Sequence, residues 1–524
     1  MNKTLRKAFV IVSICCVVLI ALYVSLTVFI THKIKNGLTN LPDHIQLGYK
    51  NIEIDLLSAS AELDSVSIKL NSTDLSTKLF SATLKTIQIE GVSYRDIIFK
   101  RKLSINNLKM EAPNVVQFSS KVEKLKDESK VKSNDSKKPT KIFLNQLSIT
   151  NGSFKQYDSL KKEKLSAKSV EIFFNEVNYN AEKHKKSIPF NFKSFSINGQ
   201  SLMAKTGAYE TLNVKTFKIT DQTVQFRDGV YQTKYSRNEL SKHIKKEKDH
   251  FVVLFDEVQT DNYNIKELES GFLDIKISLL NLNNVNATIY RNKLLPDDFT
   301  HKKLYSEQLR ELKHHLKIDL IKIKNSEITY AEKVKVGAKP GELYFKNLNA
   351  TIANLGNNYN EDKEVDINVT ATFMNQTNLK VDWSFNVNNS HDRFLFKAAF
   401  NKLPAEDLNP FVTPNLSIGL EGVLEETYFT IGGNKHIGAI DFRTRYDNFK
   451  VDIFDRETRK KKKFLSGLIN LFIAKDSDKN TNGFRSARVE QVERDPTKSI
   501  FNFIWLNARS GLLKAMTSKG EKKD

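Results

Sequence analysis

The sequence predicts a mainly β protein with one N-terminal transmembrane helix and a few amphipathic helices. Three observations predict this fold class: short stretches of alternating apolar and polar residues, a long uncharged segment near the N-terminus, and a weakly repeated strand motif. The chain has 524 residues, of which 40% are hydrophobic, so it can bury a sizeable core or line an apolar groove. With only 20 glycines and 10 prolines, collagen-like and proline-rich chains are excluded.

The N-terminal segment from Ala8 to Ile30 carries no charge. At about 1.5 Å per residue it is roughly 34 Å long, which is enough to cross the ~30 Å hydrocarbon core of a bilayer. The alternative is a cleaved signal peptide, but the apolar run continues without an Ala-x-Ala cleavage pattern. We therefore predict a retained membrane anchor over residues 8–30.

Basic residues flank this anchor unequally: Lys3, Arg6 and Lys7 precede it, whereas Lys33 and Lys35 follow it. By the positive-inside rule, residues 1–7 are expected in the cytoplasm and the rest of the chain across the membrane. In a Gram-negative bacterium this is a single-pass inner-membrane protein whose bulk lies in the periplasm.

The formal net charge of +21 suits nucleic acid, anionic lipid or a polyanionic cell envelope as a partner. The predicted topology excludes nucleic acid. Both cysteines, Cys15 and Cys16, lie inside the anchor, so the rest of the chain has no disulfide, thiolate metal site or cysteine nucleophile.

A strand motif recurs after the anchor, with an apolar, a polar and an apolar residue followed by a turn-prone residue and a later apolar residue. Period-two alternation is typical of strands with one apolar and one polar face. Because Gly, Asn or Asp occupies the turn-prone position, we expect each copy to form a strand, a tight turn and a returning strand. The four matches are residues 87–94, 147–154, 217–224 and 321–328.

Two segments interrupt the alternation of apolar and polar residues, the Lys-rich residues 121–141 and residues 301–316, and the C-terminal region differs in composition from both. Residues 301–316 place Tyr305, Leu309 and Leu312 at helical spacing and predict an amphipathic helix. At the C-terminus, basic and apolar runs alternate; such segments either lie on an anionic membrane or partner, or form helices that plug one end of the β structure. The predicted order after the anchor is a first β-repeat region (31–120), a Lys-rich linker or loop (121–141), a second β-repeat region (142–300), the helix (301–316), a third β-repeat region (317–455) and C-terminal basic and apolar helical segments with a tail (456–524).

No catalytic or metal-binding motif is present. The ten histidines are scattered, and neither a His-Glu-x-x-His motif nor a phosphate-binding glycine loop nor a nucleophile elbow occurs. A carboxylate pair assembled in three dimensions remains the alternative. We therefore expect a non-enzymatic protein without cofactor or metal.

The order of these parts resembles the AsmA-like family of envelope proteins, in particular its Bacteroidota-type members. The segments that carry the resemblance are residues 47–56, 66–70, 87–94 and 103–108 near the start, and residues 419–451 and 500–505 near the end. The resemblance implies an elongated, curved antiparallel sheet or groove of repeated short strands with an apolar inner face. It also implies a role in outer-membrane integrity or in moving phospholipid between the membranes, with bridge-like lipid-transfer proteins as relatives.

The alternation itself predicts how such a protein works. If the apolar residues of successive strands share one face and that face stays open, it accepts acyl chains, gaining about 0.8 kcal/mol per buried CH₂. We expect phospholipids and the inner membrane as partners, with other envelope proteins or the outer membrane as further candidates. The alternative function is a structural or assembly factor that moves no lipid. The candidate groove residues are Ile87, Ile89, Leu147, Ile149, Phe217, Ile219, Ile321 and Ile323.

Overall fold

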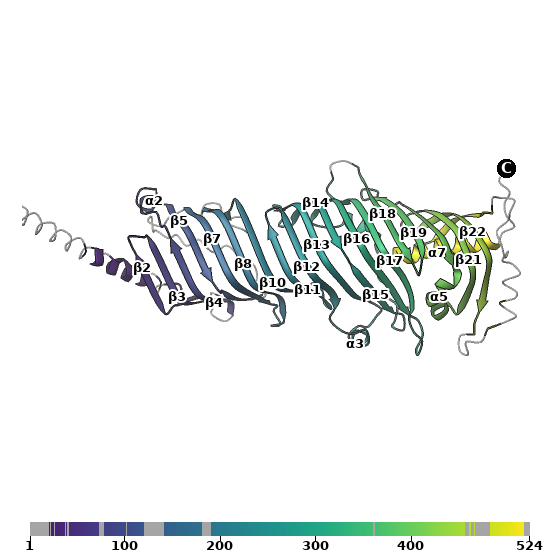
Figure 1. Cartoon of the computed structure of the whole chain (residues 1–524), viewed down its shortest axis with the longest axis horizontal. Helices are drawn as coiled ribbons and strands as arrows, with labels where there is room; N and C mark the ends of the chain where they lie inside the picture. Colours follow the sequence, from purple (N-terminus) through teal and green to yellow (C-terminus); the bar gives the residue numbers. More distant parts are fainter. Residues whose placement is uncertain are drawn as a thin grey trace, which may run out of the picture. The chain divides into compact units, whose positions relative to one another are not determined.

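The computed structural model is mainly β, and its strands follow one another in chain order (Figure 1). It divides into two compact units, one of residues 1–205 and 214–221 and the other of residues 206–213 and 222–524. The structure describes residues 20, 23–25, 27–36, 38, 41–72, 78–100, 102–119, 141–180, 190–359, 362–455, 461–462, 466 and 483–517.

The first unit is a sheet that begins with β1 and β2, both paired antiparallel with β3. The sheet continues from β3 to β4. The strands β5 and β6 each pair with β4 on one side and with β7 on the other. Next to β7 lies β8, which also pairs with β9 and β10. One short helix, α2 (Tyr94–Lys100), connects β4 to β5. The strands are β1 (Ile45–Gly48), β2 (Asn51–Asp55), β3 (Ser60–Asn71), β4 (Lys78–Glu90), β5 (Lys102–Glu111), β6 (Asn114–Phe118), β7 (Lys141–Tyr157), β8 (Glu163–Asn180), β9 (Phe190–Asn191) and β10 (Ser194–Lys205).

The second unit repeats this arrangement and extends it. β13 pairs antiparallel with β12, β14 and β15, and β14 and β15 both pair parallel with β16. From β16 to β23 every strand pairs antiparallel with the next. The strands are β12 (Thr223–Thr233), β13 (Asp249–Glu267), β14 (Leu273–Asn283), β15 (Asn286–Asn292), β16 (His315–Lys333), β17 (Gly341–Gly356), β18 (Glu364–Phe373), β19 (Thr377–Asn386), β20 (Phe394–Pro404), β21 (Ile418–Gly433), β22 (Ile437–Ile453) and β23 (Arg485–Glu493), while β11 (Glu210–Thr220) is divided between the units.

Helices α3, α4, α5 and α7 and the 3₁₀ helix η2 accompany this second sheet. The helices α3 and α4 lie on connections between strands, whereas α5 and η2 follow β20, and α7 follows β23. Ser236 caps α3 in a capping box with Glu239. Their bounds are α3 (Arg237–His243), α4 (Tyr305–Arg310), η2 (Ala405–Leu408), α5 (Asn409–Leu416) and α7 (Ile500–Thr517).

The two segments predicted to interrupt the β pattern occupy the same topological position. Each connects parallel strands: β6 to β7 in the first unit, and β15 to β16 in the second. Parallel strands cannot be joined by a tight turn, so a long connection is needed at both places. The Lys-rich segment 121–140 of the first connection lies outside the described residues.

The expected tight turns are wrong at two of the four repeated motifs. Asn151 and Asn325 have left-handed backbone conformations, with φ of 52° and 50°, but they lie inside the continuous strands β7 and β16. There the pairing register shifts, so each asparagine forms a β-bulge. A bulge and a turn both use the left-handed conformation, which explains why the sequence signal is the same. At the other two motifs, Gly91 and Asp221 follow the ends of strands. After Asp221 the chain forms the strand β12, but after Gly91 it forms helix α2 from Tyr94, so the predicted returning strand is wrong there.

The helix expected over residues 301–316 is shorter than predicted. The helix α4 ends at Arg310, and β16 begins at His315. Leu316 pairs in parallel register with Ile275 of β14, and the Asn357 side chain accepts a hydrogen bond from the Leu316 backbone amide at 2.8 Å. Sheet hydrogen bonds therefore replace the last predicted helical turn.

The C-terminal region also contains a strand that was not predicted: β23 pairs with β22 inside the region expected to be helical. Its alternation of charged and apolar residues is short, and it lies between segments that are rich in basic and apolar residues. The basic and apolar run at 456–473 lies largely outside the described residues, whereas residues 500–517 form a helix, as expected.

Of the predicted anchor over 8–30, only residues 20, 23–25 and 27–30 are described, and they are helical; Ala8 lies outside them, and Ile30 lies within. No helix among the described residues combines the length and the apolarity needed to span a membrane.

Candidate functional site

Two neighbouring rows of apolar side chains cross the first unit from strand to strand. The strand registers align the residues of each row side by side, and alternation places both rows on one face of the sheet. We call these rows the N-terminal strip. One row is Ile52, Leu63, Ile87, Met110, Ile149, Ile172 and Ile197, and the other is Ile54, Ala61, Ile89, Leu108, Leu147, Phe174 and Phe195.

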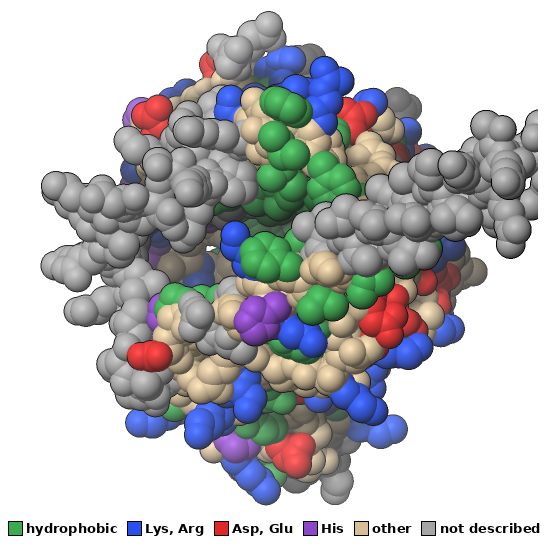
Figure 2. All heavy atoms as spheres, turned by 90° about the vertical axis from the view of Figure 1, so that its left-hand side faces the viewer, with side chains coloured by type: hydrophobic (Ala, Val, Ile, Leu, Met, Phe, Trp, Pro, Cys, Tyr) green, Lys and Arg blue, Asp and Glu red, His purple; other side chains and the backbone are tan. Residues whose placement is uncertain are grey.

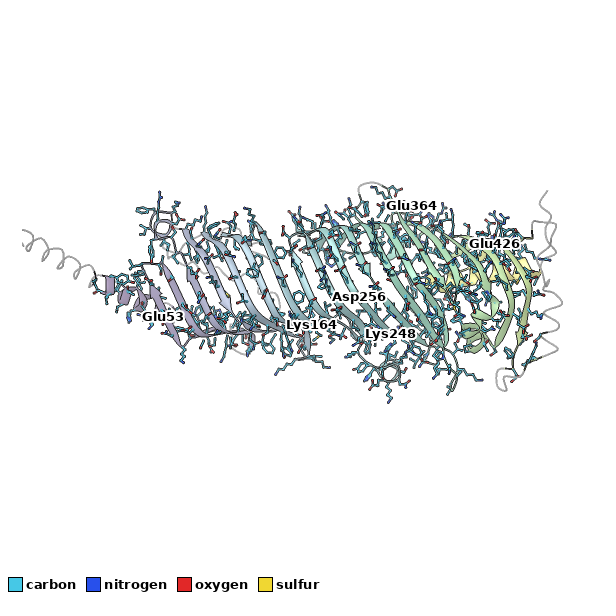
Figure 3. The ribbon with its side chains drawn as sticks, viewed as in Figure 1. Glu53, Lys164, Lys248, Asp256, Glu364 and Glu426 are labelled. Atoms are coloured by element: carbon cyan, nitrogen blue, oxygen red, sulfur yellow. The ribbon has the colours of Figure 1, made fainter. Side chains whose placement is uncertain are left out.

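The opposite face of the same strands is mainly polar. There Glu90 accepts hydrogen bonds from Lys109 and Asn107, and Lys85 forms an ion pair of 2.7 Å with Glu111. Figure 3 labels Glu53 on β2, whose register partner Glu62 begins a polar row that continues through Gln88. A sheet with one apolar and one polar face must cover the apolar face or offer it to a ligand.

The second unit carries an equivalent pair of rows, which we call the C-terminal strip. It runs from β12 to β23 and is apolar throughout except at Thr260 of β13. One row is Phe226, Val258, Leu282, Ile323, Ala350, Val369, Val381, Ala398, Phe429, Phe442 and Ala487, and the other is Val224, Thr260, Leu280, Ile321, Ile352, Ile367, Trp383, Phe396, Ile431, Ile440 and Val489.

Most of the predicted groove residues lie on these strips. Ile87, Ile89, Leu147 and Ile149 belong to the N-terminal strip, and all four are half-buried. Ile321 and Ile323 are neighbours on the C-terminal strip, one buried and the other half-buried.

The remaining two predicted residues lie on β11. Phe217 is buried, and its ring lies against Gly199 of β10, where a Cβ atom would come within 2.4 Å of the ring. Gly199 is two residues beyond Ile197, so Phe217 contacts the sheet beside the N-terminal strip. Ile219 is half-buried.

Helix α7 covers the last part of the C-terminal strip. Its residues Ile500, Phe503 and Ala515 are buried in one core with Ile431 and Ile440, which are fully buried. Phe503 forms an edge-to-face contact with Phe394, their ring centroids 6.2 Å apart. The helix therefore closes this end of the strip, which is the plugging arrangement that the sequence left as one of two alternatives.

Two glycines allow this close packing. A Cβ atom on Gly511 of α7 would lie 2.8 Å from the Cβ of Phe442, and one on Gly438 of β22 would lie 2.9 Å from the ring of Phe503. Glycine at both positions lets the helix backbone approach the sheet.

The connection before β16 also covers this end. Leu304 is buried in the same core, and the ring of Tyr305 lies 5.5 Å from that of Trp383. Arg310 of α4 donates to the Asp392 carboxylate at 2.8 Å and to the Val387 carbonyl at 2.6 Å, which holds α4 on the loop between β19 and β20.

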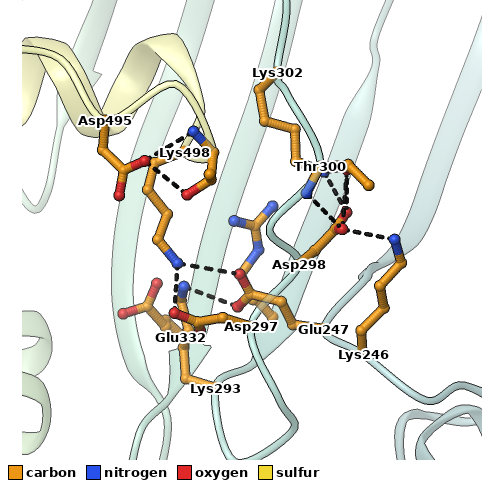
Figure 4. A network of polar contacts seen from close by, with 12 residues as sticks. Lys246, Glu247, Lys293, Asp297, Asp298, Thr300, Lys302, Glu332, Asp495 and Lys498 are labelled. Atoms are coloured by element: carbon orange, nitrogen blue, oxygen red, sulfur yellow. Dashed lines mark hydrogen bonds and ion pairs between the residues drawn. The ribbon is translucent and has the colours of Figure 1, made fainter.

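A polar network joins this connection to the residues before α7 (Figure 4). Lys498 lies 2.7 Å from the Asp297 carboxylate and 3.7 Å from that of Glu247. Glu247 is nearly buried and also lies 2.8 Å from Lys293. The network brings together three segments that are distant in the sequence.

Asp298 forms the second half of this network. It accepts hydrogen bonds from Lys246, at 2.6 Å, and from Lys302 and Thr300. These bonds, with that from Lys246 the strongest, hold the pKa of the Asp298 carboxyl well below its usual range. The carboxylate is therefore charged at neutral pH and fixes the connection between β15 and α4.

Within the described ranges, no group of three or more His, Cys, Asp or Glu side chains is placed to hold a metal ion. The half-buried part of the strips can bind hydrocarbon, because such binding needs apolar area and no reactive group.

Sequence reasoning missed most of the strip residues, for example Met110, Ile172 and Leu282. Each lies in an alternating stretch, so the signal was present, but the strand register that aligns the residues into rows is set by the bulges. The covering role of α7 could not be read from its amphipathic pattern alone.

No model of a known protein family matches this chain, and no characterised protein shows significant sequence similarity to it.

Proposed function

We propose that this chain is a membrane-anchored periplasmic protein of AsmA-like type that binds phospholipid acyl chains along its apolar strips and takes part in phospholipid transfer or outer-membrane lipid homeostasis. The observation that carries the proposal is the pair of unbroken apolar rows, half-buried over much of their length. The predicted segment 8–30 would attach the chain to the inner membrane.

The chemistry of the strips suits acyl chains better than a compact polar ligand. In each row an apolar side chain follows the next at the strand spacing of about 4.8 Å, so a hydrocarbon chain meets apolar contacts at every strand. Each CH₂ buried in this way gains about 0.8 kcal/mol. The headgroup would stay in water, where it needs no site of its own.

Photocrosslinking from adjacent residues of one strand tests this proposal. In the full-length chain in its membrane, a benzophenone amino acid is placed at Ile149, on the strip, or at Thr150, which is exposed on the opposite face. After illumination with radiolabelled phospholipid present, we expect label on the Ile149 variant and little on the Thr150 variant.

The second unit offers the same matched pair. Ile323 lies on the C-terminal strip, and the next residue, Lys324, is exposed. Equal labelling of neighbouring residues, or no labelling at either strip position, would contradict lipid binding and favour a structural or assembly factor for envelope proteins.

Charge substitution tests the same surface without a probe. Ile149→Arg places a cation in the middle of the N-terminal strip and should reduce phospholipid crosslinking at Ile87 by about tenfold or more, since a desolvated charge opposes hydrocarbon. Thr150→Arg, beside Glu111 on the polar face, is the control and should leave crosslinking unchanged.

A further inference from the structure

The helix α2 exposes large apolar side chains that pack against nothing in the described structure. Phe99 is 79% exposed, Ile98 is 69% exposed, and no residue of this seven-residue helix is buried. Single exposed apolar residues are common on soluble proteins, but consecutive ones usually mark a contact surface.

A further exposed apolar residue lies on the neighbouring turn. Leu57, between β2 and β3, is 83% exposed. The Tyr94 hydroxyl of α2 donates a hydrogen bond of 3.0 Å to the carbonyl of Leu56, which joins the turn to the helix. We call Leu57 together with Tyr94, Ile97, Ile98 and Phe99 the edge patch.

The edge patch is connected to the described end of the N-terminal helix. The Tyr23 hydroxyl donates a hydrogen bond of 3.0 Å to Asp55, and the same carboxylate oxygen accepts the backbone amide of Leu57 at 2.9 Å. Val24 and Val28 of the helix are exposed by 52% and 64%. Residues that belong to the predicted membrane anchor therefore lie beside the edge patch.

Both cationic and anionic side chains flank the edge patch: Arg95, Asp96 and Lys100 lie on α2, and Asp55 lies beside Leu57. Arg95 and Lys100 are exposed, and the one acidic residue of α2, Asp96, is paired with Lys100 at 2.8 Å and accepts a hydrogen bond from Ser104. Figure 2 views the molecule from the side on which α2 lies and shows a stripe of hydrophobic side chains with Lys and Arg side chains beside it. Exposed apolar side chains with cations such as Arg95 and Lys100 beside them are typical of segments that enter an anionic membrane surface.

We propose that the edge patch inserts into the surface of a bilayer that contains anionic phospholipid, next to the N-terminal anchor. This inference rests on the anchoring part of the proposed function, but not on lipid binding by the strips. It also deepens that function. The strip residues closest to the turns that bear the edge patch are Ile54, Ala61 and Ile89. With the edge patch inserted, they would lie at the membrane surface, where a phospholipid could enter the strip.

The test uses full-length protein in liposomes of phosphatidylethanolamine and phosphatidylglycerol, with Cys15 and Cys16 replaced by serine. A single cysteine at Phe99 carries an environment-sensitive fluorophore. The control is a single cysteine at Leu160, which is 73% exposed. The strands β5 and β7 are parallel; α2 lies just before the start of β5, whereas Leu160 lies just after the end of β7. The two labels therefore lie at opposite edges of the same sheet.

We expect the label at Phe99 to emit at shorter wavelength, to be quenched by brominated lipid, and to be about threefold less accessible to aqueous iodide than the label at Leu160. Iodide quenching of Phe99 equal to that of Leu160 would overturn the inference and would indicate a water-exposed or protein-binding surface. Crosslinking of phospholipid at Ile149 is measured separately in either case. If the edge patch inserts but no lipid crosslinks to the strip, only the proposed function is contradicted.

The contribution of charge is tested in the same liposomes. Replacing both Arg95 and Lys100 by glutamine should reduce the quenching by brominated lipid, and so should liposomes of phosphatidylcholine alone. If quenching depends on neither change, the anionic lipid part of the inference is wrong.

Discussion

The two units place the same alternating pattern on a sheet but treat its apolar face differently. In the first unit, Ile87, Leu147 and Ile149 remain half-buried, and within the described residues no helix buries them. In the second unit, the equivalent rows end under α7, where Ile431 and Ile440 are fully buried. Strand alternation thus creates an apolar face in both, whereas a helix distant in sequence decides whether that face is a core.

The difference also separates two kinds of contribution to the protein. Residues under α7 stabilise the fold, because their apolar area is removed from water by the protein itself. Residues of the N-terminal strip keep part of their area available for a ligand. The same substitution at the two places should therefore have different effects, and the predictions below rely on this contrast.

The largest effect is expected for Ile431→Arg, which buries an unpaired charge under α7. We expect a loss of more than about 4 kcal/mol in the free energy of unfolding. The matched substitution Ile149→Arg should cost about 1 kcal/mol or less, because a long side chain on a half-buried surface can extend its charge to water. Urea unfolding of the full-length chain measures both. Similar losses at the two positions would remove the distinction between covered and open faces.

The next effect is expected for Phe503→Ala, which leaves a cavity between α7 and the sheet. The fully buried ring contacts Phe394, so the loss should be about 3–5 kcal/mol. Because the strip beneath is then less well covered, an apolar dye should bind more strongly to this variant. Leu513→Ala, on the same helix but 52% exposed, is the control. If dye binding does not change, α7 does not determine access to the strip.

Gly511→Ala should have a smaller effect on stability, and its cause is overpacking where Phe503→Ala leaves a cavity. Alanine is the better helix former by about 1 kcal/mol, but its Cβ would meet that of Phe442 at 2.8 Å, and overpacking costs about 1–3 kcal/mol. We expect a net destabilisation in thermal unfolding, whereas Arg509→Ala, at an exposed position of α7, should be neutral or stabilising. A more stable Gly511→Ala variant would show that α7 packs less closely than described.

The smallest effect concerns pH. The pKa of Asp298 is lowered by its hydrogen bonds with Lys246 and Lys302, so its carboxylate stabilises the folded state above the unfolded pKa of about 3.9. This contribution is lost as the pH falls from that value through the folded pKa. We expect Asp298→Asn to lower the melting temperature by a few degrees at pH 7 and by less at pH 3, and we expect the difference to vanish only once the pH falls below the folded pKa. A difference that stays constant between these two pH values would exclude the charge as its cause.

A second comparison concerns the repeated motif. Asn151 and Asn325 occupy equivalent bulges: the Ala112 amide donates to the Thr150 carbonyl at 2.8 Å, and the Asn284 amide donates to the Lys324 carbonyl at 3.0 Å. These two motif copies, Leu147–Phe154 and Ile321–Ile328, are therefore structurally equivalent. The sequence predicted repetition correctly here, but it predicted turns where the chain forms bulges.

The local features of this protein follow from its amino-acid pattern. Alternation identified the strands and the side of each that faces away from water, so Ile87, Ile149 and Ile323 could be chosen as apolar-face residues. Their alignment into rows depends on strand registers that the bulges set, because the shift of one residue at a bulge exchanges the two faces.

Only the tertiary structure decided which part of the apolar face is covered. The pattern of residues 500–517 predicts a helix but not its partner, because an amphipathic helix can bury its apolar side on a membrane, on another protein or on its own sheet. The contacts of Phe503 with Phe394 and of Gly511 with Phe442 settle this choice, since they join positions that are distant in sequence. Covering is a non-local property, and local alternation carries no information about it.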